Sequence, residues 1–169
     1  MKATILIIDD EESIRKLLSR IISLEGFEVL EADKISTAKK ILQQKDTDVI
    51  LCDVKLSDGN GVDFVAELKT KYPLSEIILL TAYGNIPDGI TAMKNGAFDY
   101  IVKGDDNDSI IPLLNRAAEK TALAKRILHL EEKVSKKYSF ESIIGKSKSI
   151  LTAVEMAKRL LQQILLYYY

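Results

Sequence analysis

The stretch ILIIDDEES, residues 5–13, joins an aliphatic run directly to four acidic residues. Its aliphatic part shows no alternation of polar and apolar positions, which is typical of a strand that is covered on both faces. The acidic part begins where that strand ends. A buried strand that opens onto carboxylates predicts a ligand site at one edge of a sheet.

Four more aliphatic runs of strand length follow, namely FEVLE (27–31), DVILC (48–52), EIILL (76–80) and FDYIV (98–102). Between the runs, apolar residues recur at helical spacing. Strands that alternate with helices predict a parallel sheet with right-handed crossovers. The fold class is therefore α/β, with a five-stranded, doubly wound parallel sheet in a domain that ends near residue 120.

Polar residues follow four of these predicted strands: Asp9 and Asp10, Asp53, Thr81, and Lys103. The carboxyl ends of parallel strands meet at one edge, where such sheets bind ligands. Three carboxylates held together repel one another, and a hard divalent cation such as Mg²⁺ or Mn²⁺ would relieve that repulsion. Asp53 can then act as a nucleophile that forms an acyl phosphate, with Lys103 and Thr81 beside the phosphate oxygens.

Together with CDVKLSDGNG around Asp53, TAYG from Thr81 and FDYIVK up to Lys103, these residues resemble the receiver domain of bacterial two-component response regulators. The resemblance covers residues 1 to about 120 and implies a flavodoxin-like fold. It implies that a sensor histidine kinase transfers a phosphoryl group to Asp53. It also implies that Asp10, Asp53 and the backbone carbonyl of Lys55 bind Mg²⁺, that Asp9 acts largely through water, and that Lys103 pairs with the phosphate.

The same resemblance implies a switch at Thr81 and Tyr100. Thr81 would move toward the phosphate, and Tyr100 would turn inward behind it, which changes the surface formed by the fourth helix, fifth strand and fifth helix. Such a switch is a two-state equilibrium that contacts to the phosphate bias. Glu11 and Glu12 are interpreted as first-turn residues of the next helix, where the helix dipole favours acidic side chains.

The fifth helix is predicted to continue beyond the domain. Pro112 is expected in its first turn, and no glycine or proline interrupts residues 113–137. Leucine, isoleucine and valine then follow at spacings of four, three and four, which is a short heptad seam formed by Leu123, Ile127, Leu130 and Val134. Residues 121–137 are therefore predicted to be a coiled-coil-like linker that supports a parallel homodimer.

Residues 138–160, YSFESIIGKSKSILTAVEMAKRL, resemble the opening segment of the AAA+ domain in sigma-54-dependent, NtrC-like transcriptional activators. We expect residues 138–169 to be a truncated start of that domain. The phosphate-binding pattern GxxxxGK[ST] is absent from the sequence, so no ATPase activity is expected of it. The resemblance implies that the chain is the amino-terminal part of such a regulator.

The amino-acid composition limits the binding partners and the cellular compartment that can be expected of the chain. With 24 basic and 25 acidic residues, the chain has no excess positive charge to attract DNA or an anionic membrane. It has one cysteine, Cys52, and neither a signal-peptide pattern nor a membrane-length apolar run. We therefore expect a cytoplasmic protein. Cys52 is interpreted as a buried apolar residue, and His129 as a solvated helix residue.

Other functions compete with that of a phosphorylated receiver. Hydrolases of the haloacid-dehalogenase kind need a second carboxylate two residues after the nucleophile, and Lys55 stands there. Slow self-dephosphorylation is thus expected rather than enzymatic turnover. A receiver-like binding module that acts without phosphate stays open, although the acidic triad with Thr81 and Lys103 argues against it.

Overall fold

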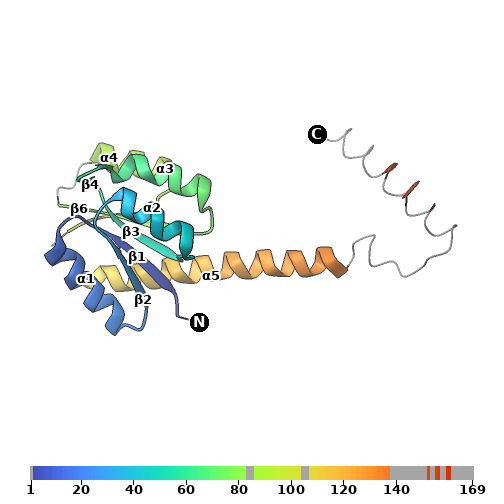
Figure 1. Ribbon diagram of the computed structural model, residues 1–169, viewed down its shortest axis with the longest axis horizontal. Coiled ribbons are helices and arrows are strands. Elements are labelled where there is room, and N and C mark those ends of the chain that lie inside the picture. Colours follow the sequence, from blue (N-terminus) through green and yellow to red (C-terminus); the bar gives the residue numbers. More distant parts are fainter. Residues whose placement is uncertain are drawn as a thin grey trace. The chain divides into compact units, whose positions relative to one another are not determined.

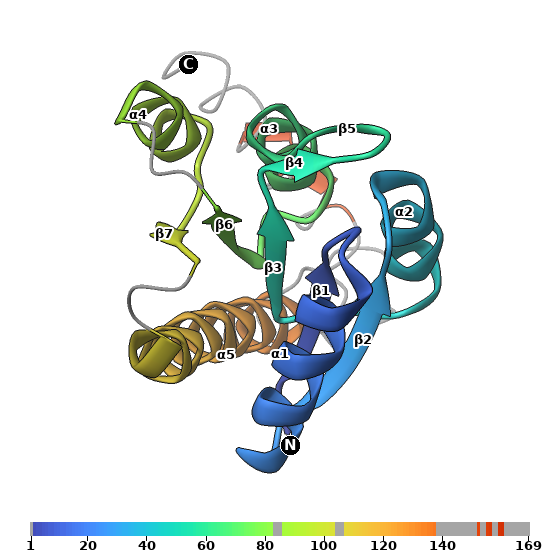
Figure 2. The ribbon, with the colours of Figure 1, turned by 90° about the vertical axis from the view of Figure 1, so that its left-hand side faces the viewer.

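The computed structural model describes residues 2–82, 86–103 and 107–137, and also residues 152, 155, 156, 159 and 160. Its five-stranded parallel sheet has the order β2-β1-β3-β6-β7 (Figure 2). The strands are β1 (Thr4–Ile8), β2 (Glu28–Ala32), β3 (Val49–Asp53), β6 (Glu76–Thr81) and β7 (Asp99–Val102). The predicted five-stranded parallel sheet is confirmed, and each strand lies within one residue of its predicted bounds.

The strand order reverses at β1, because β1 pairs with β2 on one side and with β3 on the other. Ile8, the last residue of β1, lies opposite Cys52 of β3. Asp9 and Asp53, the residues that follow this pair, therefore leave neighbouring strands at the same edge. The point where strand order reverses is where open α/β sheets usually bind ligands.

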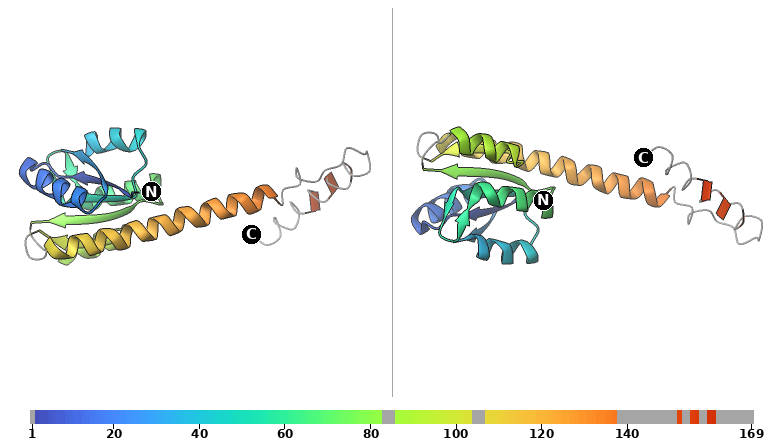
Figure 3. Two further views of the ribbon diagram at one scale, coloured as in Figure 1. Left: turned by 90° about the horizontal axis from the view of Figure 1, so that it is seen from below. Right: turned by 90° about the horizontal axis from the view of Figure 1, so that it is seen from above.

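Helices cover both faces of the sheet (Figures 1 and 3). One face carries α2 (Ile35–Gln44), α3 (Gly61–Lys71) and α4 (Ile86–Lys94), and the other carries α1 (Glu12–Leu24) and α5 (Asn107–Lys137). Alternate residues of β1 enter the two cores: Leu6 and Ile8 face the first three helices, and Ile5 and Ile7 face the other two. Burial on both faces explains why the strands are continuous apolar runs.

A short antiparallel hairpin follows β3, formed by β4 (Lys55–Leu56) and β5 (Gly59–Asn60). The turn of this hairpin occupies Ser57 and Asp58. Strands of two residues are too short to show a periodic pattern. This hairpin lies directly after Asp53.

Two details of the helix starts differ from expectation. α1 begins at Glu12, so Glu11 is the extended residue before the helix and not part of its first turn. α5 begins at Asn107, which places Pro112 in the second turn, where its ring removes a helical N–H donor. Pro112 itself is exposed, whereas the next two residues, Leu113 and Leu114, are buried in the core and anchor the helix beyond the proline.

The chain divides into two compact units, residues 1–126 and residues 127–169, and α5 crosses this division without a break. The predicted boundaries at residues 120 and 137 stay predictions. The resemblance to an AAA+ segment concerns residues of which nearly all lie outside the described part of the chain. Across the described ranges, no helix combines the length and the apolar character needed to cross a bilayer.

Candidate functional site

Three carboxylates gather where β1 and β3 end. Asp9, Asp10 and Asp53 each offer an oxygen, and these oxygens all lie within 4.8 Å of one another. Asp9 is fully buried, Asp53 is 8% exposed, and Asp10 is open to solvent. The sequence predicted this cluster, and the pairing of β1 with β3 brings it together.

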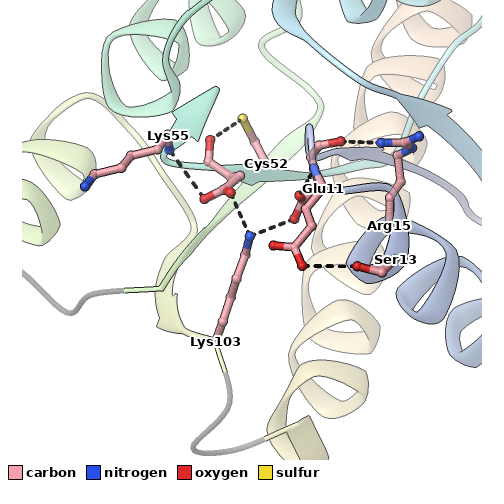
Figure 4. A network of polar contacts seen from close by, with 8 residues as sticks. Glu11, Ser13, Arg15, Cys52, Lys55 and Lys103 are labelled. Atoms are coloured by element: carbon pink, nitrogen blue, oxygen red, sulfur yellow. Dashed lines mark hydrogen bonds and ion pairs between the residues drawn. The ribbon is translucent and has the colours of Figure 1, made fainter. Parts of the chain in front are cut away.

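Lys103 follows the edge strand β7, and its side chain reaches the cluster past β6. Its Nζ donates to Asp53 Oδ2 at 2.6 Å and to Asp9 Oδ2 at 2.8 Å (Figure 4). Its backbone N–H donates to the carbonyl of Thr81 at 2.6 Å. The side chain is 15% exposed. One ammonium group therefore bridges two buried carboxylates, while the third carboxylate, Asp10, lies beside them.

The charges of the site influence one another strongly. Burial raises the pKa of Asp53, Lys103 opposes that rise, and the nearby charge of Asp9 adds to it, so that the pKa of Asp53 is raised. Burial lowers the pKa of Lys103, but hydrogen bonds and attraction from Asp53 and Asp9 outweigh burial and leave its pKa raised. Lys103 therefore stays protonated and positively charged. Its charge does not fully offset the cost of burying the Asp53 carboxylate.

Backbone groups orient the two buried carboxylates. Asp9 Oδ1 accepts a hydrogen bond from the N–H of Glu11 at 2.9 Å, and Arg15 Nη1 donates to the Asp9 carbonyl at 2.7 Å. Asp53 Oδ1 accepts from the N–H of Lys55 at 3.4 Å. Figure 4 shows these groups around Lys103. The sequence did not predict the part of Arg15, because nothing in its spacing links it to Asp9.

Gly61 allows α3 to begin directly against Asp53. A Cβ atom at residue 61 would overlap the backbone carbonyl of Asp53. The N–H of Gly61 donates to the carbonyl of Val54 at 2.8 Å, and Asn60 caps the helix through the N–H of Val62 at 2.8 Å. The close approach of Gly61 to the Asp53 carbonyl fixes the backbone at Asp53, and only a residue without a side chain permits this approach.

Thr81 and Tyr100 lie on the α3 and α4 side of the sheet. Thr81 ends β6, is 4% exposed and pairs with Val102. Tyr100 pairs with Leu79, two residues earlier, and its half-buried ring lies beside Gly89 of α4. The Tyr100 hydroxyl is buried and has no hydrogen-bond partner among the residues that the structure describes.

The structure therefore brings most of the predicted site residues together. Asp9, Asp10, Asp53 and Lys103 form one cluster, and Lys55 contacts it through its backbone. Thr81 joins through the backbone of Lys103, whereas Tyr100 faces α4. A donor set of oxygens alone, with more negative than positive charge, fits a hard divalent cation.

Comparisons with known proteins agree with this geometry. The model of the response regulator receiver domain matches residues 5–115. The chain is 31% identical to the regulatory protein AtoC of Escherichia coli K12 over 147 residues, which is 87% of this chain and 32% of AtoC. It is 37% identical to a putative NtrX-like response regulator of Rickettsia bellii over 132 residues, 77% of this chain and 28% of the relative.

Two solved structures are similar as well. The beryllofluoride-activated NtrC4 receiver domain dimer has a TM-score of 0.67 at 31% identity, covering 70% of this chain and 98% of that one. NtrX from Brucella abortus in complex with ATP has a TM-score of 0.70 at 30% identity, covering 77% of this chain and 30% of that one. The chain spans about a third of the length of the curated relatives named above.

Proposed function

The chain belongs to the response regulator receiver family, and from this premise we propose that Asp53 accepts a phosphoryl group in a Mg²⁺-dependent reaction. The predicted resemblance to NtrC-like regulators is confirmed by the relatives. One observation carries the proposal: Lys103 bridges Asp9 and Asp53 at 2.8 and 2.6 Å, while a third carboxylate, that of Asp10, lies beside them. The site has the nucleophile, the phosphate-binding cation and a surplus of metal ligands.

In the proposed reaction, a carboxylate oxygen of Asp53 attacks the phosphorus atom of the donor. The bond from phosphorus to the donor's leaving group breaks, and Asp53 becomes an acyl phosphate. Asp10, Asp53 and the carbonyl of Lys55 would hold Mg²⁺, with Asp9 acting largely through water. When bound, the metal supplies positive charge to the phosphoryl oxygens. Lys103 pairs with the phosphate, and the Thr81 hydroxyl donates to it.

The donor is a sensor histidine kinase, and the compartment is the cytoplasm. Lys55 occupies the place at which an aspartyl-phosphate hydrolase would carry its acid and base carboxylate. Without that group the acyl phosphate is lost only slowly. The module therefore stores a signal and does not turn over substrate as an enzyme.

Tyr100 supports the proposed switch with Thr81. A buried hydroxyl without a partner costs about 1–3 kcal/mol, and the Tyr100 hydroxyl is such a group among the described residues. The position of the Tyr100 side chain beside Gly89 is thus only as stable as its ring packing makes it. Contacts between Thr81 and the phosphate would shift this balance and change the surface near α4.

The proposed homodimer uses the exposed seam of α5. Leu123, Ile127, Leu130 and Val134 are 54, 57, 51 and 56% exposed. With β-branched residues at the a positions (Ile127, Val134) and leucine at the d positions, the seam favours a parallel two-stranded coiled coil. In that arrangement Arg126 at g lies opposite Glu131 at e of the second copy, which pairs opposite charges twice.

The contacts of α5 with the rest of the receiver leave this seam free. Thr121 and Lys125, which bind Asp48, occupy b and f positions on the opposite side of the helix. Further toward the amino end of α5, the a and d positions that continue the seam are occupied by Lys120 and Arg116. Both cations lie over the Phe98 ring, and Lys120 also pairs with Glu76 at 2.9 Å. The apolar seam therefore begins at Leu123.

The curated relatives are about three times as long as this chain, and the match covers only part of them. We propose that this chain is the amino-terminal, signal-receiving part of a sigma-54-dependent transcriptional activator, and that the fragment itself binds neither DNA nor membrane. Phosphorylation would act on the downstream domains through α5.

Intact mass after exposure to acetyl phosphate tests the central proposal. The wild type and Asp53→Asn are treated with and without Mg²⁺. We expect a single phosphoryl adduct that needs both Mg²⁺ and Asp53. No adduct on folded wild-type protein that binds Mg²⁺ would contradict the proposal and favour the phosphate-independent binding module.

Sedimentation equilibrium tests the dimer. Ile127→Lys, within the seam, is expected to lower the dimer fraction. Leu128→Lys is the matched control, because Leu128 is similarly exposed, at 46%, but lies at a b position outside the seam. Equal dimer fractions in the two variants would refute the assigned seam.

A further inference from the structure

Asp58 connects the hairpin after Asp53 to the start of α2. Its Oδ1 accepts from the N–H of Ile35 at 2.8 Å, and its Oδ2 accepts from the N–H of Ser36 at 2.9 Å. The residue at the cap position of α2, Lys34, provides no side-chain cap of its own. Asp58 therefore supplies this cap from 22 and 23 residues away in the sequence.

Two further contacts show how closely the hairpin is fitted to this place. Leu56 is 9% exposed and belongs to the core that α2 and α3 share. Gly59 lies against α2 so closely that a Cβ atom there would come within 2.7 Å of Ile35 Cδ1. The hairpin is thus held at its tip by Asp58, at its side by Leu56 and at its base by the contact of Gly61 with Asp53.

The same hairpin carries Lys55, whose N–H points to Asp53 Oδ1 at 3.4 Å. Lys55 pairs with Asn60, and Leu56 pairs with Gly59, so backbone pairing connects β4 to the tip of the hairpin. A shift of Asp58 relative to α2 would be transmitted through these short strands to the backbone of Lys55. Groups that hold a metal ligand in place are known to influence metal affinity strongly.

From this geometry we infer that Asp58 is a positioning residue for cation binding and phosphoryl transfer at Asp53, acting through the backbone of Lys55. Asp58 touches neither the phosphoryl group nor the metal. Its carboxylate is well suited to the task, because hydrogen bonds from the Ser36 and Ile35 N–H groups outweigh burial and lower its pKa. The inference rests on the proposed function, since it assumes that the Lys55 carbonyl is a ligand.

The experiment must separate positioning from simple stabilisation of α2. Asp58→Ala removes both roles. Lys34→Ser gives α2 a local cap, so the double variant Asp58→Ala/Lys34→Ser restores the cap without restoring the link to the hairpin. Lys34→Ser alone is the reference for the double variant. Asp63→Ala, an exposed acidic residue in the first turn of α3, controls for the lost negative charge.

Two quantities are measured on the whole chain: the Mg²⁺ dissociation constant by calorimetric titration, and stability by urea unfolding without metal. We expect Asp58→Ala to weaken Mg²⁺ binding roughly tenfold and to lower the urea midpoint. The double variant should recover the midpoint while its Mg²⁺ binding stays roughly tenfold weaker than that of Lys34→Ser. Asp63→Ala should bind Mg²⁺ within about twofold of the wild type.

Recovery of Mg²⁺ affinity in the double variant would overturn the inference, because Asp58 would then act only by stabilising α2. Unchanged affinity in Asp58→Ala would overturn it as well. Failure of the proposed function has a different signature: the folded wild type itself would gain no adduct from acetyl phosphate.

Discussion

The two edges of the sheet contain the same kinds of side chain, yet they are balanced differently. At the amino edge, Asp48 accepts from Lys125 at 2.6 Å and from the Thr4 N–H at 2.8 Å. Glu76 there pairs with Lys69 at 3.1 Å and Lys120 at 2.9 Å. At the carboxyl edge, Lys103 pairs with Asp9 and Asp53, and the third carboxylate, that of Asp10, lies beside them.

This difference separates a structural cluster from a reactive one. At the amino edge, Asp48 and Glu76 each pair with at least one lysine. Asp48 also joins β1, β3, β6 and α5, because its carbonyl accepts from Thr121 Oγ1 and from the Glu76 N–H. These groups are neutralised within the protein. The carboxyl edge keeps a surplus of negative charge, which a bound cation can neutralise.

The largest expected effect follows from removing the lysine of the carboxyl edge. Lys103→Met leaves Asp9 and Asp53 facing each other without a cation, and removing one partner of a buried pair costs about 3 kcal/mol. Saturating Mg²⁺ should restore part of this loss, because it binds the folded state. Urea unfolding in EDTA measures the loss of stability, and urea unfolding in Mg²⁺ measures the recovery. A loss that Mg²⁺ leaves unchanged would show that the carboxylates do not share a cation site.

The next largest effect belongs to the amino edge. Asp48→Asn weakens the bonds to Lys125 and to the Thr4 N–H, and we expect a loss of about 1–2 kcal/mol. In contrast to Lys103→Met, this loss should be the same with EDTA and with Mg²⁺. Asp46→Asn, an exposed neighbour in the same loop, is the control and should change the unfolding free energy by less than about 0.5 kcal/mol. A Mg²⁺-dependent loss in Asp48→Asn would break the contrast between the edges.

A smaller effect of opposite sign is expected for Asp53→Asn. The folded-state pKa of Asp53 is raised above its ordinary value of 3.8. Its contribution to stability is thus fully present below that value and is lost as the pH rises through the folded pKa. Without metal at neutral pH, the neutral asparagine should therefore stabilise the fold relative to the charged aspartate, and the gain should vanish in acid. Urea midpoints measured across the acidic range in EDTA check this; a loss of stability at neutral pH would contradict it.

The smallest effect is expected for Lys120→Met. Lys120 is 60% exposed, and Glu76 keeps its contact with Lys69, whose side chain is 21% exposed. Exposed ion pairs contribute roughly 0–1 kcal/mol, so the unfolding free energy should fall by less than about 0.5 kcal/mol. Lys69→Met serves as the comparison and should cost more, because Lys69 also donates to the Ser75 carbonyl at 2.7 Å. The reverse order would show that exposure does not govern these pairs.

Much of the site could be predicted before the structure. Strands buried on both faces are uninterrupted apolar runs, so the strand ends were clear, and polar residues at those ends marked Asp9, Asp53, Thr81 and Lys103. The hairpin after Asp53 was missed because its strands are two residues each. Asp58 and Asp48 were missed because their partners lie far away in the sequence.

Hydrophobic periodicity and residue type are local properties of the chain, and they were therefore enough to predict the class of fold and the chemistry of the carboxyl edge. Which charges are compensated could be seen only after folding brings distant residues together. Lys103 and Asp53 form an ion pair although they are 50 residues apart in the sequence, and Lys125 and Asp48 do so at a separation of 77 residues. Electrostatic balance depends on distance in space and on burial, and only the packed sheet sets these for each carboxylate.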